Sequence, residues 1–511
     1  MSRIKTALIS VHDKSNLLNL LIILKKFKVN IISSGGTFKE IKRLGFKSNE
    51  ISKLTNFPEI LNGRVKTLHP KIHGGILSKR KNKIHNKNLK DNKISEIDLV
   101  IVNFYPFEKI ISKTKNEKSI IENIDIGGPA MARAAAKNFN DVTVLTNINQ
   151  YSDLIKNIKK NNGSTSLNFR KEMAKNAFSA TAHYDVVVSN YFNNVLKDNF
   201  PNKKLISLNL IDRLRYGENP HQKASIYSSS NLNLKKLNGK QLSYNNYNDI
   251  YSALKISKSL PKNLGTVIIK HGNPCGVSIN SNKLKSFELA LKSDPISAYG
   301  GVISCNYKIS KNIAKNISKI FLEAIVANGY ENAALKILKT KKNLRIIDAK
   351  DLNLKYSENL LSNFNSLLIQ TPDNKLFFPK DFKTVSKIKP SSKMLKNLIF
   401  AFNICRFVKS NAIVLTNGDS TIGIGSGQPS RVDSCNIAIN KMKKFQKNNN
   451  EDILAASDAF FPFVDGIEKL VQSGVKAIIQ PSGSIRDKEI IKYANDTNTV
   501  LVFSKTRHFN H

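Results

Sequence analysis

Tryptophan is absent from the 511 residues of this chain, and cysteine, methionine and acidic residues are scarce. The four cysteines, Cys275, Cys305, Cys405 and Cys435, form no C-x-x-C pair, which argues against a zinc knuckle and a disulfide framework. No run approaches the roughly 20 apolar residues that span a bilayer, and the opening residues MSRI show no signal-peptide pattern. We therefore expect a cytoplasmic protein with free thiols and no membrane partner.

Acidic residues are too few to balance the basic ones: 38 Asp and Glu stand against 81 Lys and Arg, a formal net charge of +43. Only 13 of the basic residues are arginine, and the lysines are mixed with asparagine and isoleucine, as in KNKIHNKNLKDNK over 81–93. That composition is typical of AT-rich coding sequences. A solvated lysine surface and a groove for a polyanion both remain open. Because no aromatic stripe, helix-turn-helix or RRM-like pattern accompanies the charge, we expect no nucleic-acid partner.

Strand-like and helix-like segments alternate along the chain, whose length and 41% hydrophobic residues suffice for roughly two to four domains. Near the start, apolar runs at 6–11 and 29–34 alternate with helix-like stretches at 15–27 and 38–44, the order of a parallel sheet covered on both faces. Further strands are expected at 98–103 and 141–145, and near 266–270, 300–305, 411–415 and 475–480.

A polar stretch at 193–210 indicates a domain boundary. We expect one domain over 1–195, a linker over 196–210, and a second region over 211–511 that divides again near 372–393. No short-period repeat is visible.

Three loops rich in serine, threonine and glycine occur in the first domain, and open α/β sheets bind ligands at the carboxyl ends of their strands. Hydroxyl and backbone N–H groups suit a phosphate, and Lys or Arg completes its charge. Ordinary turn chemistry explains any one loop, whereas three together favour an anion site. The residues are Ser10 and Lys14 in SVHDKS, Ser34, Gly35, Gly36 and Thr37 in SSGGT, and Arg64, Lys66 and Thr67 in RVKTLHP.

His69 and His73 in HPKIHGG stand four residues apart, a spacing that on a helix suggests a metal site. Pro70 and the Gly74-Gly75 pair argue against a helix at this point. No Glu accompanies the histidines, so we expect no metal here.

The segment 126–129 opens an Ala-rich helix that runs to Lys137, and Gly and Pro at a helix start leave N–H groups free for an anion. Asp125 stands just before this start. It is either a plain helix-start residue or a carboxylate placed for proton transfer.

In the second region, RYGENPHQ at 215–222 combines many hydrogen-bonding groups, and KHGNPCG at 270–276 follows a predicted strand. Lys270 beside His271 favours a neutral imidazole, the form that a general base requires. The order His…Pro-Cys also resembles the zinc deaminase signature H-x-E…P-C-x-x-C. Because Asn273 replaces its Glu and no second Cys follows, we expect no zinc.

Three further segments carry site chemistry. GIGSGQPSR at 423–431 has alternating glycines that allow a flat ligand close to the backbone, and it does not match the dinucleotide G-x-G-x-x-G pattern. SDAFFPF at 457–463 places aromatic faces near carboxylates, which suits a conjugated heterocycle, with core packing as the alternative. RHFNH at 507–511 is either a frayed end or part of a site.

Twelve segments occur in the same order as in the bifunctional purine-biosynthesis enzymes that join an AICAR transformylase to an IMP cyclohydrolase. The chain resembles this family over nearly its whole length, and the ordered set is far more specific than any single segment. The segments are ISVHDKSN, SSGGT, GRVKTLHPKIHGG, NFYPF, NIDIGGPAMARAAAKN, LRYGENPHQ, KHGNPCG, SAYGG, IGIGSGQPSRVDS, SDAFFPF, QPSGSIRD and RHFNH.

The resemblance implies an α/β fold: an N-terminal methylglyoxal-synthase-like parallel-sheet domain followed by two cytidine-deaminase-like α/β subdomains without zinc. It implies that the cosubstrate 10-formyltetrahydrofolate formylates the 5-amine of AICAR to give FAICAR, which then closes to IMP with loss of water. It implies no catalytic metal, and the family's intertwined active sites imply a homodimer.

The resemblance also assigns residues. The transformylase centre comprises Lys270, His271 as base and Asn411, and the cyclohydrolase centre comprises Lys66, Tyr105, Asp125 and Lys137. The remaining positions are Arg215, Tyr216, Arg507, Phe509 and His511 for the nucleotide, Phe460, Pro462, Phe463 and Asp465 for folate, and Ser10, Lys14, Ser34, Gly35, Gly36, Thr37, Arg64 and Thr67 for phosphate and ribose.

The chain departs from the family near the end of the first domain. The family often has His-Thr-Ala-x-Tyr-Asp where this chain has ATAHYD over 180–185. The histidine, His183, is displaced by three positions, so the resemblance assigns it no role.

Overall fold

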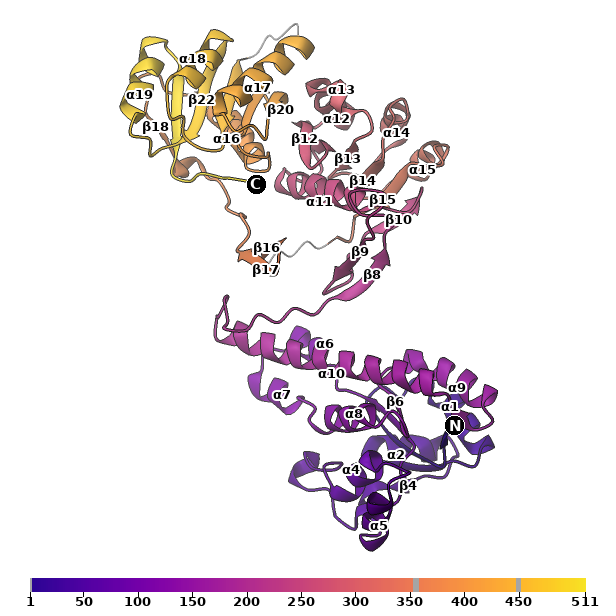
Figure 1. Ribbon diagram of the computed structural model, residues 1–511. Coiled ribbons are helices and arrows are strands. Elements are labelled where there is room, and N and C mark those ends of the chain that lie inside the picture. Colours follow the sequence, from indigo (N-terminus) through magenta and orange to yellow (C-terminus); the bar gives the residue numbers. More distant parts are fainter. Residues whose placement is uncertain (1, 353–357, 447–451) are drawn as a thin grey trace. The chain divides into compact units, whose positions relative to one another are not determined.

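The computed structural model describes residues 2–352, 358–446 and 452–511. The chain divides into two compact units, Met1–Ser207 and Leu208–His511, and each is built around a sheet of its own (Figure 1). No helix in the described part of the chain combines the length and apolar character needed to cross a membrane.

The sheet of unit 1 has five parallel strands in the order β4-β3-β2-β5-β6, so all five end at the same edge. In register, Leu8 of β2 lies between Ile32 of β3 and Val100 of β5. The four strands expected in this region are confirmed. The strands are β2 (Thr6–Val11), β3 (Asn30–Ser33), β4 (Asn49–Glu50), β5 (Leu99–Asn103) and β6 (Thr143–Leu145), with a separate pair β1 (Ser2–Arg3) and β7 (Ser164–Thr165).

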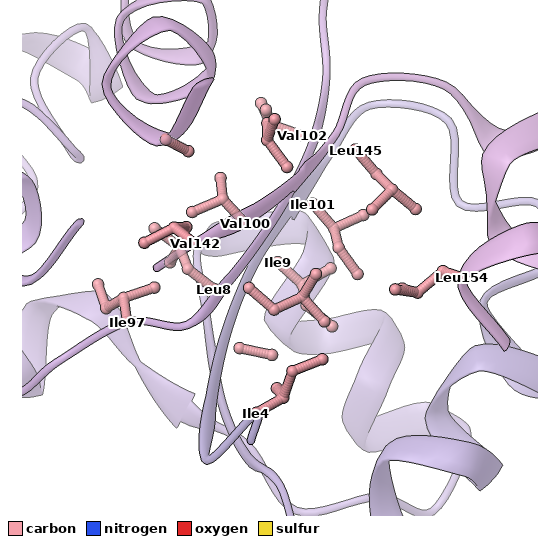
Figure 2. Close-up of a cluster of buried hydrophobic side chains, with 14 of the residues drawn as sticks. Ile4, Leu8, Ile9, Ile97, Val100, Ile101, Val102, Val142, Leu145 and Leu154 are labelled. Atoms are coloured by element: carbon pink, nitrogen blue, oxygen red, sulfur yellow. The ribbon is translucent and has the colours of Figure 1, made fainter. Parts of the chain in front are cut away.

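The core of unit 1 surrounds the central strands, where Leu8, Ile9 and Val100 are completely buried (Figure 2). Continuous apolar strands are typical of a parallel sheet covered on both faces. Helix α8 packs on β5 and β6, and the 29-residue α10 packs on α8 and β6. The helices are α1 (Leu17–Lys26), α2 (Gly35–Arg43), α3 (Ile51–Thr55), α4 (Pro70–Leu77), α5 (Lys83–Asp91), α6 (Phe107–Lys113), α7 (Glu117–Glu122), α8 (Gly127–Lys137), α9 (Tyr151–Lys160) and α10 (Leu167–Val195).

The expectation that no helix follows His69 is wrong. Helix α4 begins at Pro70, where proline's missing N–H costs nothing and its fixed φ suits the first turn. The ring of His69 caps this helix, because its Nδ1 accepts the N–H of Lys71 at 3.1 Å. Gly75 lets the helix approach its neighbour: a Cβ at this position would lie 2.4 Å from the carbonyl oxygen of Ser95.

Unit 2 contains a twelve-stranded sheet in the order β10-β15-β14-β13-β11-β12-β20-β19-β21-β22-β23-β18. The four strands expected in this region are confirmed, although β19 begins at Ile413 rather than at 411. The strands are β10 (Lys235–Asn238), β11 (Gly265–Lys270), β12 (Asn273–Ile279), β13 (Val302–Cys305), β14 (Ala324–Ala327), β15 (Arg345–Asp348), β18 (Phe382–Thr384), β19 (Ile413–Asn417), β20 (Ser420–Gly425), β21 (Ile453–Ser457), β22 (Val475–Pro481) and β23 (Val500–Ser504).

Helices connect these strands, and two small hairpins stand apart from the sheet. The helices are α11 (Tyr244–Ser259), α12 (Lys283–Ser293), α13 (Pro295–Ala298), α14 (Lys311–Ile317), α15 (Asn332–Lys339), α16 (Ser392–Cys405), α17 (Arg431–Phe445), α18 (Asp465–Gln472) and α19 (Asp487–Asp496). The hairpins are β8 (Asn209–Arg213) with β9 (Ser225–Ser228), and β16 (Asn359–Asn363) with β17 (Ser366–Gln370).

The large sheet consists of two halves with the same construction. Outward from its centre, the strands of one half run β12, β11, β13, β14, β15, β10, and those of the other run β20, β19, β21, β22, β23, β18. In both halves, successive pairs are antiparallel, antiparallel, parallel, parallel and antiparallel. Unit 2 therefore contains an internal duplication that no short-period sequence repeat reveals.

Strand directions bring distant segments to one edge of this sheet. β11 ends where β12 begins, β20 is antiparallel to β12 and so ends at the same edge, and β19 begins there. β21, β22 and β23 also end at this edge. The segments that follow or precede these ends are therefore neighbours, although they are far apart in sequence.

Candidate active sites

Unit 1 gathers polar loops at the carboxyl edge of its parallel sheet. The hydroxyl oxygens of Ser10 and Ser34 lie 3.0 Å apart. Thr37 Oγ1 donates to a carbonyl of β2 and accepts an N–H from the same residue, each at 3.0 Å, which fixes the start of α2 beside β2. A Cβ added to Gly36 would lie 3.8 Å from Lys14 Nζ. The helix start, two hydroxyls and a lysine thus share one small region.

Two basic residues of this site, Lys66 and Arg64, have acidic partners. Lys66 Nζ lies 2.6 Å from Glu59 Oε1, and Arg64 Nε lies 3.2 Å from Glu122 Oε1. Both pairs are substantially exposed, and solvent-exposed ion pairs are worth at most about 1 kcal/mol. An anionic ligand can therefore replace these carboxylates at small cost.

Asp125 lies at the start of α8, where its Oδ1 accepts the N–H of Gly128 at 2.8 Å. Burial raises the pKa of the Asp125 carboxyl, while N–H groups of Gly128 and Tyr105 and the nearby His12 act in the opposite direction. The ring of His12 meets that of Tyr105 edge-on, with centroids 5.2 Å apart. Asp125 thus caps the helix and also has the raised pKa that suits proton transfer.

Tyr184 of α10 forms a hydrogen bond with the backbone of Asp125. This tyrosine was not among the expected site residues. Its Oη accepts the N–H of Asp125 at 2.8 Å and lies 3.4 Å from the carbonyl oxygen of Asn123. Its ring meets Phe104 edge-on at 5.5 Å. Burial raises the pKa of Tyr184 to about 12, so the phenol stays neutral. The sequence signal was the segment ATAHYD, in which this tyrosine follows the displaced histidine.

Two residues of unit 1 lie away from this cluster. Lys137 is the exposed last residue of α8, about 15 Å along the helix from its start at a rise of 1.5 Å per residue. One chain therefore does not bring Lys137 to Asp125. The displaced His183 lies 2.8 Å from Ser207 Oγ and 3.4 Å from Glu108, and so ties α10 to neighbouring segments.

In unit 2, His271 and Gly272 form the two-residue turn between β11 and β12, because Lys270 pairs with Asn273. His271 is exposed at this turn, and Lys270 Nζ donates to the carbonyl of Tyr299 at 2.7 Å. Asn273 Oδ1 accepts the N–H of Lys409 at 3.0 Å. This bond connects the turn to the segment that carries Asn411.

Both polar atoms of the Asn411 side chain form hydrogen bonds within the protein. Its Nδ2 donates to the carbonyls of Gln428 and Pro429 at 2.9 Å each, and its Oδ1 accepts from Arg431 at 2.7 Å. Arg431 is itself buried in an ion pair with the fully buried Asp458. Arg431 was missed as a site residue although it ends the segment GIGSGQPSR.

A cavity of about 480 Å³ opens at this edge of the large sheet. Its wall is formed by four stretches of the chain, namely Asn411, 429–432, 459–463 with Asp465, and Arg507 with Phe509. These include most of the residues that the resemblance assigned to folate and nucleotide. The expected residues in its lining are Asn411, Phe460, Pro462, Phe463, Asp465, Arg507 and Phe509.

The C-terminal residues are anchored to this site. The ring of His508 is buried, and its Nδ1 lies 2.5 Å from Asp373 Oδ2. The backbone N–H of His508 donates to the carbonyl of Asp458 at 2.9 Å. Two hydrogen bonds join Asn510 to Ser410: the Asn510 N–H donates to Ser410 Oγ at 3.1 Å, and the Asn510 carbonyl accepts the Ser410 N–H at 2.9 Å. The chain end is therefore an ordered wall of the site and not a frayed tail.

Five expected residues of unit 2 lie outside the cavity lining: Lys270 and His271 at the β11–β12 turn, and Arg215, Tyr216 and His511. Arg215 stacks on Tyr216 with 4.5 Å between the guanidinium carbon and the ring centroid, and Tyr216 lies beside the start of α11. His511 packs against Phe509, with ring centroids 5.5 Å apart. Across the described residues, no three His, Cys, Asp or Glu side chains cluster as a metal site would require.

Two family models match this chain. Residues 16–130 match the model of the MGS-like domain, and residues 135–441 match the model of the AICARFT/IMPCHase bienzyme. The first match confirms the fold that the resemblance implied for the N-terminal domain.

Curated relatives match over the full length. The bifunctional purine biosynthesis protein PurH of Leptospira biflexa is 44% identical over 515 residues, with 100% of both chains covered. PurH of Fusobacterium nucleatum is 42% identical over 512 residues, covering 99% of this chain and 100% of the relative. PurH of Bradyrhizobium diazoefficiens is 41% identical over 524 residues, covering 100% and 99%. The chain belongs to the PurH family of AICARFT/IMPCHase bienzymes.

Proposed function

We propose that unit 2 transfers the formyl group of 10-formyltetrahydrofolate to the 5-amine of AICAR, and that unit 1 closes the product, FAICAR, to IMP with loss of water. As a PurH family member, the chain is a bifunctional enzyme of purine biosynthesis with formyltransferase and cyclohydrolase activities. The observation that carries the assignment to residues is the cavity of unit 2, which is lined by Asn411, Arg507 and the aromatic segment at 460–463.

Formyl transfer needs a base because the AICAR amine is a weak nucleophile, its lone pair being delocalised into the ring and carboxamide. In the proposal, His271 removes the amine proton as the nitrogen attacks the formyl carbon. Lys270 stabilises the oxyanion of the tetrahedral intermediate, and Asn411 orients the reacting groups. The C–N10 bond then breaks, and N10 of tetrahydrofolate leaves with a proton.

Folate and nucleotide would occupy different walls of the cavity. Phe460, Pro462 and Phe463 offer apolar surface to the pterin, and Asp465 can accept its N–H groups. Arg507, stacked on Phe509 at 4.6 Å, offers a cation to the nucleotide phosphate, and we assign Arg215, Tyr216 and His511 to the same ligand.

Cyclisation joins two groups of one molecule, so positioning supplies much of the rate. The FAICAR carboxamide nitrogen attacks the formyl carbon, and water leaves after proton transfer. We assign Lys66 to the developing negative charge, Asp125 to proton transfer, and Tyr105 to the same centre. The loops with Ser10, Ser34, Thr37 and the neighbouring glycines would hold the phosphate. A part for Lys137 in this reaction would require a second copy of the chain.

We also propose a cytoplasmic homodimer. The hairpin β16–β17 exposes large apolar side chains, with Phe364 98%, Leu368 63% and Leu361 61% accessible. Two isolated strands have no core of their own, and such an apolar surface is typical of a protein interface. Leu361 and Leu368 are register partners, so replacing both with Glu should convert the dimer to monomer in light scattering. A wild-type monomer at micromolar concentration would contradict the dimer.

The direct test of function supplies purified protein with AICAR and 10-formyltetrahydrofolate and follows FAICAR and IMP by chromatography. A second reaction supplies FAICAR alone. We expect IMP in both. Absence of FAICAR and IMP in the first, together with unconsumed FAICAR in the second, would overturn the proposal.

A further inference from the structure

The turn that carries His271 has an unfavourable backbone conformation. Both of its residues have positive φ, 51° at His271 and 74° at Gly272. Glycine adopts this region freely, whereas a side chain such as histidine is disfavoured there, and two-residue hairpins usually place Asn, Asp or Gly first. Such a conformation persists where surrounding groups hold it, and it is frequent at functional sites.

The carboxylate of Asp249, in α11, accepts backbone hydrogen bonds from this turn. Its Oδ1 accepts the N–H of Gly272 at 2.7 Å, and a second backbone hydrogen bond reaches its carboxylate from His271. The ladder of β11 and β12 closes with the pair Lys270 and Asn273, so it leaves these two N–H groups without a strand partner. Asp249 therefore satisfies the donors that the turn itself cannot.

Helix α11 is a rigid support for Asp249. A capping box between Ser243 and Asn246 fixes its start, and Ile250 and Ala253 are completely buried on the next turn. The helix packs on β11, the strand that leads into the turn. On the other side of the turn, Asn273 Oδ1 accepts the N–H of Lys409.

We propose that Asp249 is a positioning residue for formyl transfer, which holds the His271-Gly272 turn so that the imidazole is presented to the substrate amine. Asp249 acts through the backbone of the turn and does not touch the substrate. The inference rests on the proposed role of His271 as the general base.

The test compares Asp249→Ala and Asp249→Asn in the full chain, measuring kcat and KM for formyl transfer. A misplacement of about 1 Å costs up to roughly 100-fold, so we expect kcat to fall about 10- to 100-fold in the Ala variant with both KM values nearly unchanged. Asn keeps one acceptor oxygen, so it should recover part of the lost kcat. FAICAR cyclisation, which belongs to unit 1, should keep its wild-type rate in both variants.

Asp348→Ala is the matched control, because Asp348 also accepts a backbone N–H in unit 2, that of Lys350 at 3.0 Å, away from the site. It should leave formyl transfer unchanged. A wild-type kcat in Asp249→Ala, or a rise of KM without a fall of kcat in either variant, would overturn the positioning role. If Asp249→Ala does not fold, the same criteria apply to Asp249→Asn, whose kcat must still be reduced. A wild-type chain that makes no FAICAR would instead refute the proposed function itself.

Discussion

The two candidate sites of this chain are built in opposite ways. In unit 1, the loops of Ser10 and Ser34 follow β2 and β3, which are neighbouring strands of one parallel sheet, and the loops of Arg64 and Asp125 precede α4 and α8. In unit 2, His271 comes from one half of the duplicated sheet, while Asn411, the aromatic segment and the chain end come from the other. The two halves are joined where β12 pairs with β20, with Ser278 and Ser420 as register partners.

The two units therefore position their site residues by different means. Unit 1 obtains its site from the regular geometry of parallel strands, whose carboxyl ends always meet at one edge. Unit 2 needs specific side chains to join its segments: Arg431 orients Asn411, Asn273 links the turn to Lys409, and His508 anchors the chain end. We therefore expect single substitutions to separate the two activities and to reveal different kinds of support.

The largest effect is expected from His271→Ala. Loss of a general base typically costs about 10²- to 10⁴-fold in rate, so formyl transfer should nearly vanish. Cyclisation of FAICAR in unit 1 should proceed at the wild-type rate, since no residue of that site changes. Stopped assays on each substrate measure both rates, and parallel loss of the two activities would contradict the separation of sites.

Asp125→Asn is the counterpart in unit 1. Because burial raises the pKa of Asp125, ionisation of this carboxyl should produce a limb in the cyclisation profile above the ordinary Asp value, near 4. Activity should rise as pH rises through that limb if the carboxylate is the base. The variant should lose about 100-fold in kcat and lack the limb, with formyl transfer as the unchanged control. An identical pH profile in variant and wild type would exclude Asp125 as the titrating group.

Tyr184→Phe should have a smaller effect that is confined to unit 1. The change removes the hydroxyl that accepts the N–H of Asp125 and leaves the ring among its aromatic neighbours. We expect kcat for cyclisation to fall about 3- to 10-fold with KM unchanged, and unit 1 to lose about 1 kcal/mol of stability, the typical net value of one hydrogen bond. Tyr191→Phe is the control, because Tyr191 lies on the same helix as Tyr184 and its ring packs on Phe107. Equal effects of the two changes would argue against a specific support of Asp125.

The smallest effect is expected from Asp373→Asn, at the anchor of the chain end. Burial alone raises the pKa of the Asp373 carboxyl, but the hydrogen bond and charge of His508, with Arg406 nearby, more than offset it, so the pKa is lowered. A lowered pKa stabilises the folded state at pH values above the unfolded value near 3.9, and this stabilisation is lost as pH falls through the folded value. Because Asp373 is partly exposed, the difference at pH 7 should be below about 1 kcal/mol.

Denaturant unfolding of wild type and Asp373→Asn at pH 7 and at pH 3 measures the contribution of the Asp373 carboxylate to the free energy of unfolding. The gap in unfolding free energy should shrink at the lower pH. A gap that grows on acidification would contradict the assignment. KM for AICAR should rise in the variant at pH 7, since the anchored segment carries Arg507 and Phe509.

Local sequence patterns predicted four of the five strands of the unit 1 sheet and the polar loops of that unit, because strand alternation and the edge of a parallel sheet follow from short segments. They failed at α4, where Pro70 starts a helix instead of preventing one, since a first-turn proline loses no hydrogen bond. They also missed Tyr184 and Arg431, whose roles depend on contacts with Asp125 and Asn411 from other elements. The turn of His271 is connected to the segment of Asn411 by the hydrogen bond between Asn273 and Lys409. No local pattern encodes this contact, and the resemblance to a family supplied that link.

The turn that carries His271 has a counterpart in the other half of the duplicated sheet. In the other half, β19 and β20 are joined by a turn of the same length, Gly418-Asp419, because Asn417 pairs with Ser420. Its first residue also has positive φ, 58°, but here it is glycine, the residue that this backbone prefers. By strand direction, this second turn lies at the opposite edge of the sheet. One hairpin therefore has glycine, which adopts a positive φ freely, as the first residue of its turn. The other has histidine there, in a disfavoured backbone conformation, and thereby places an imidazole at the site.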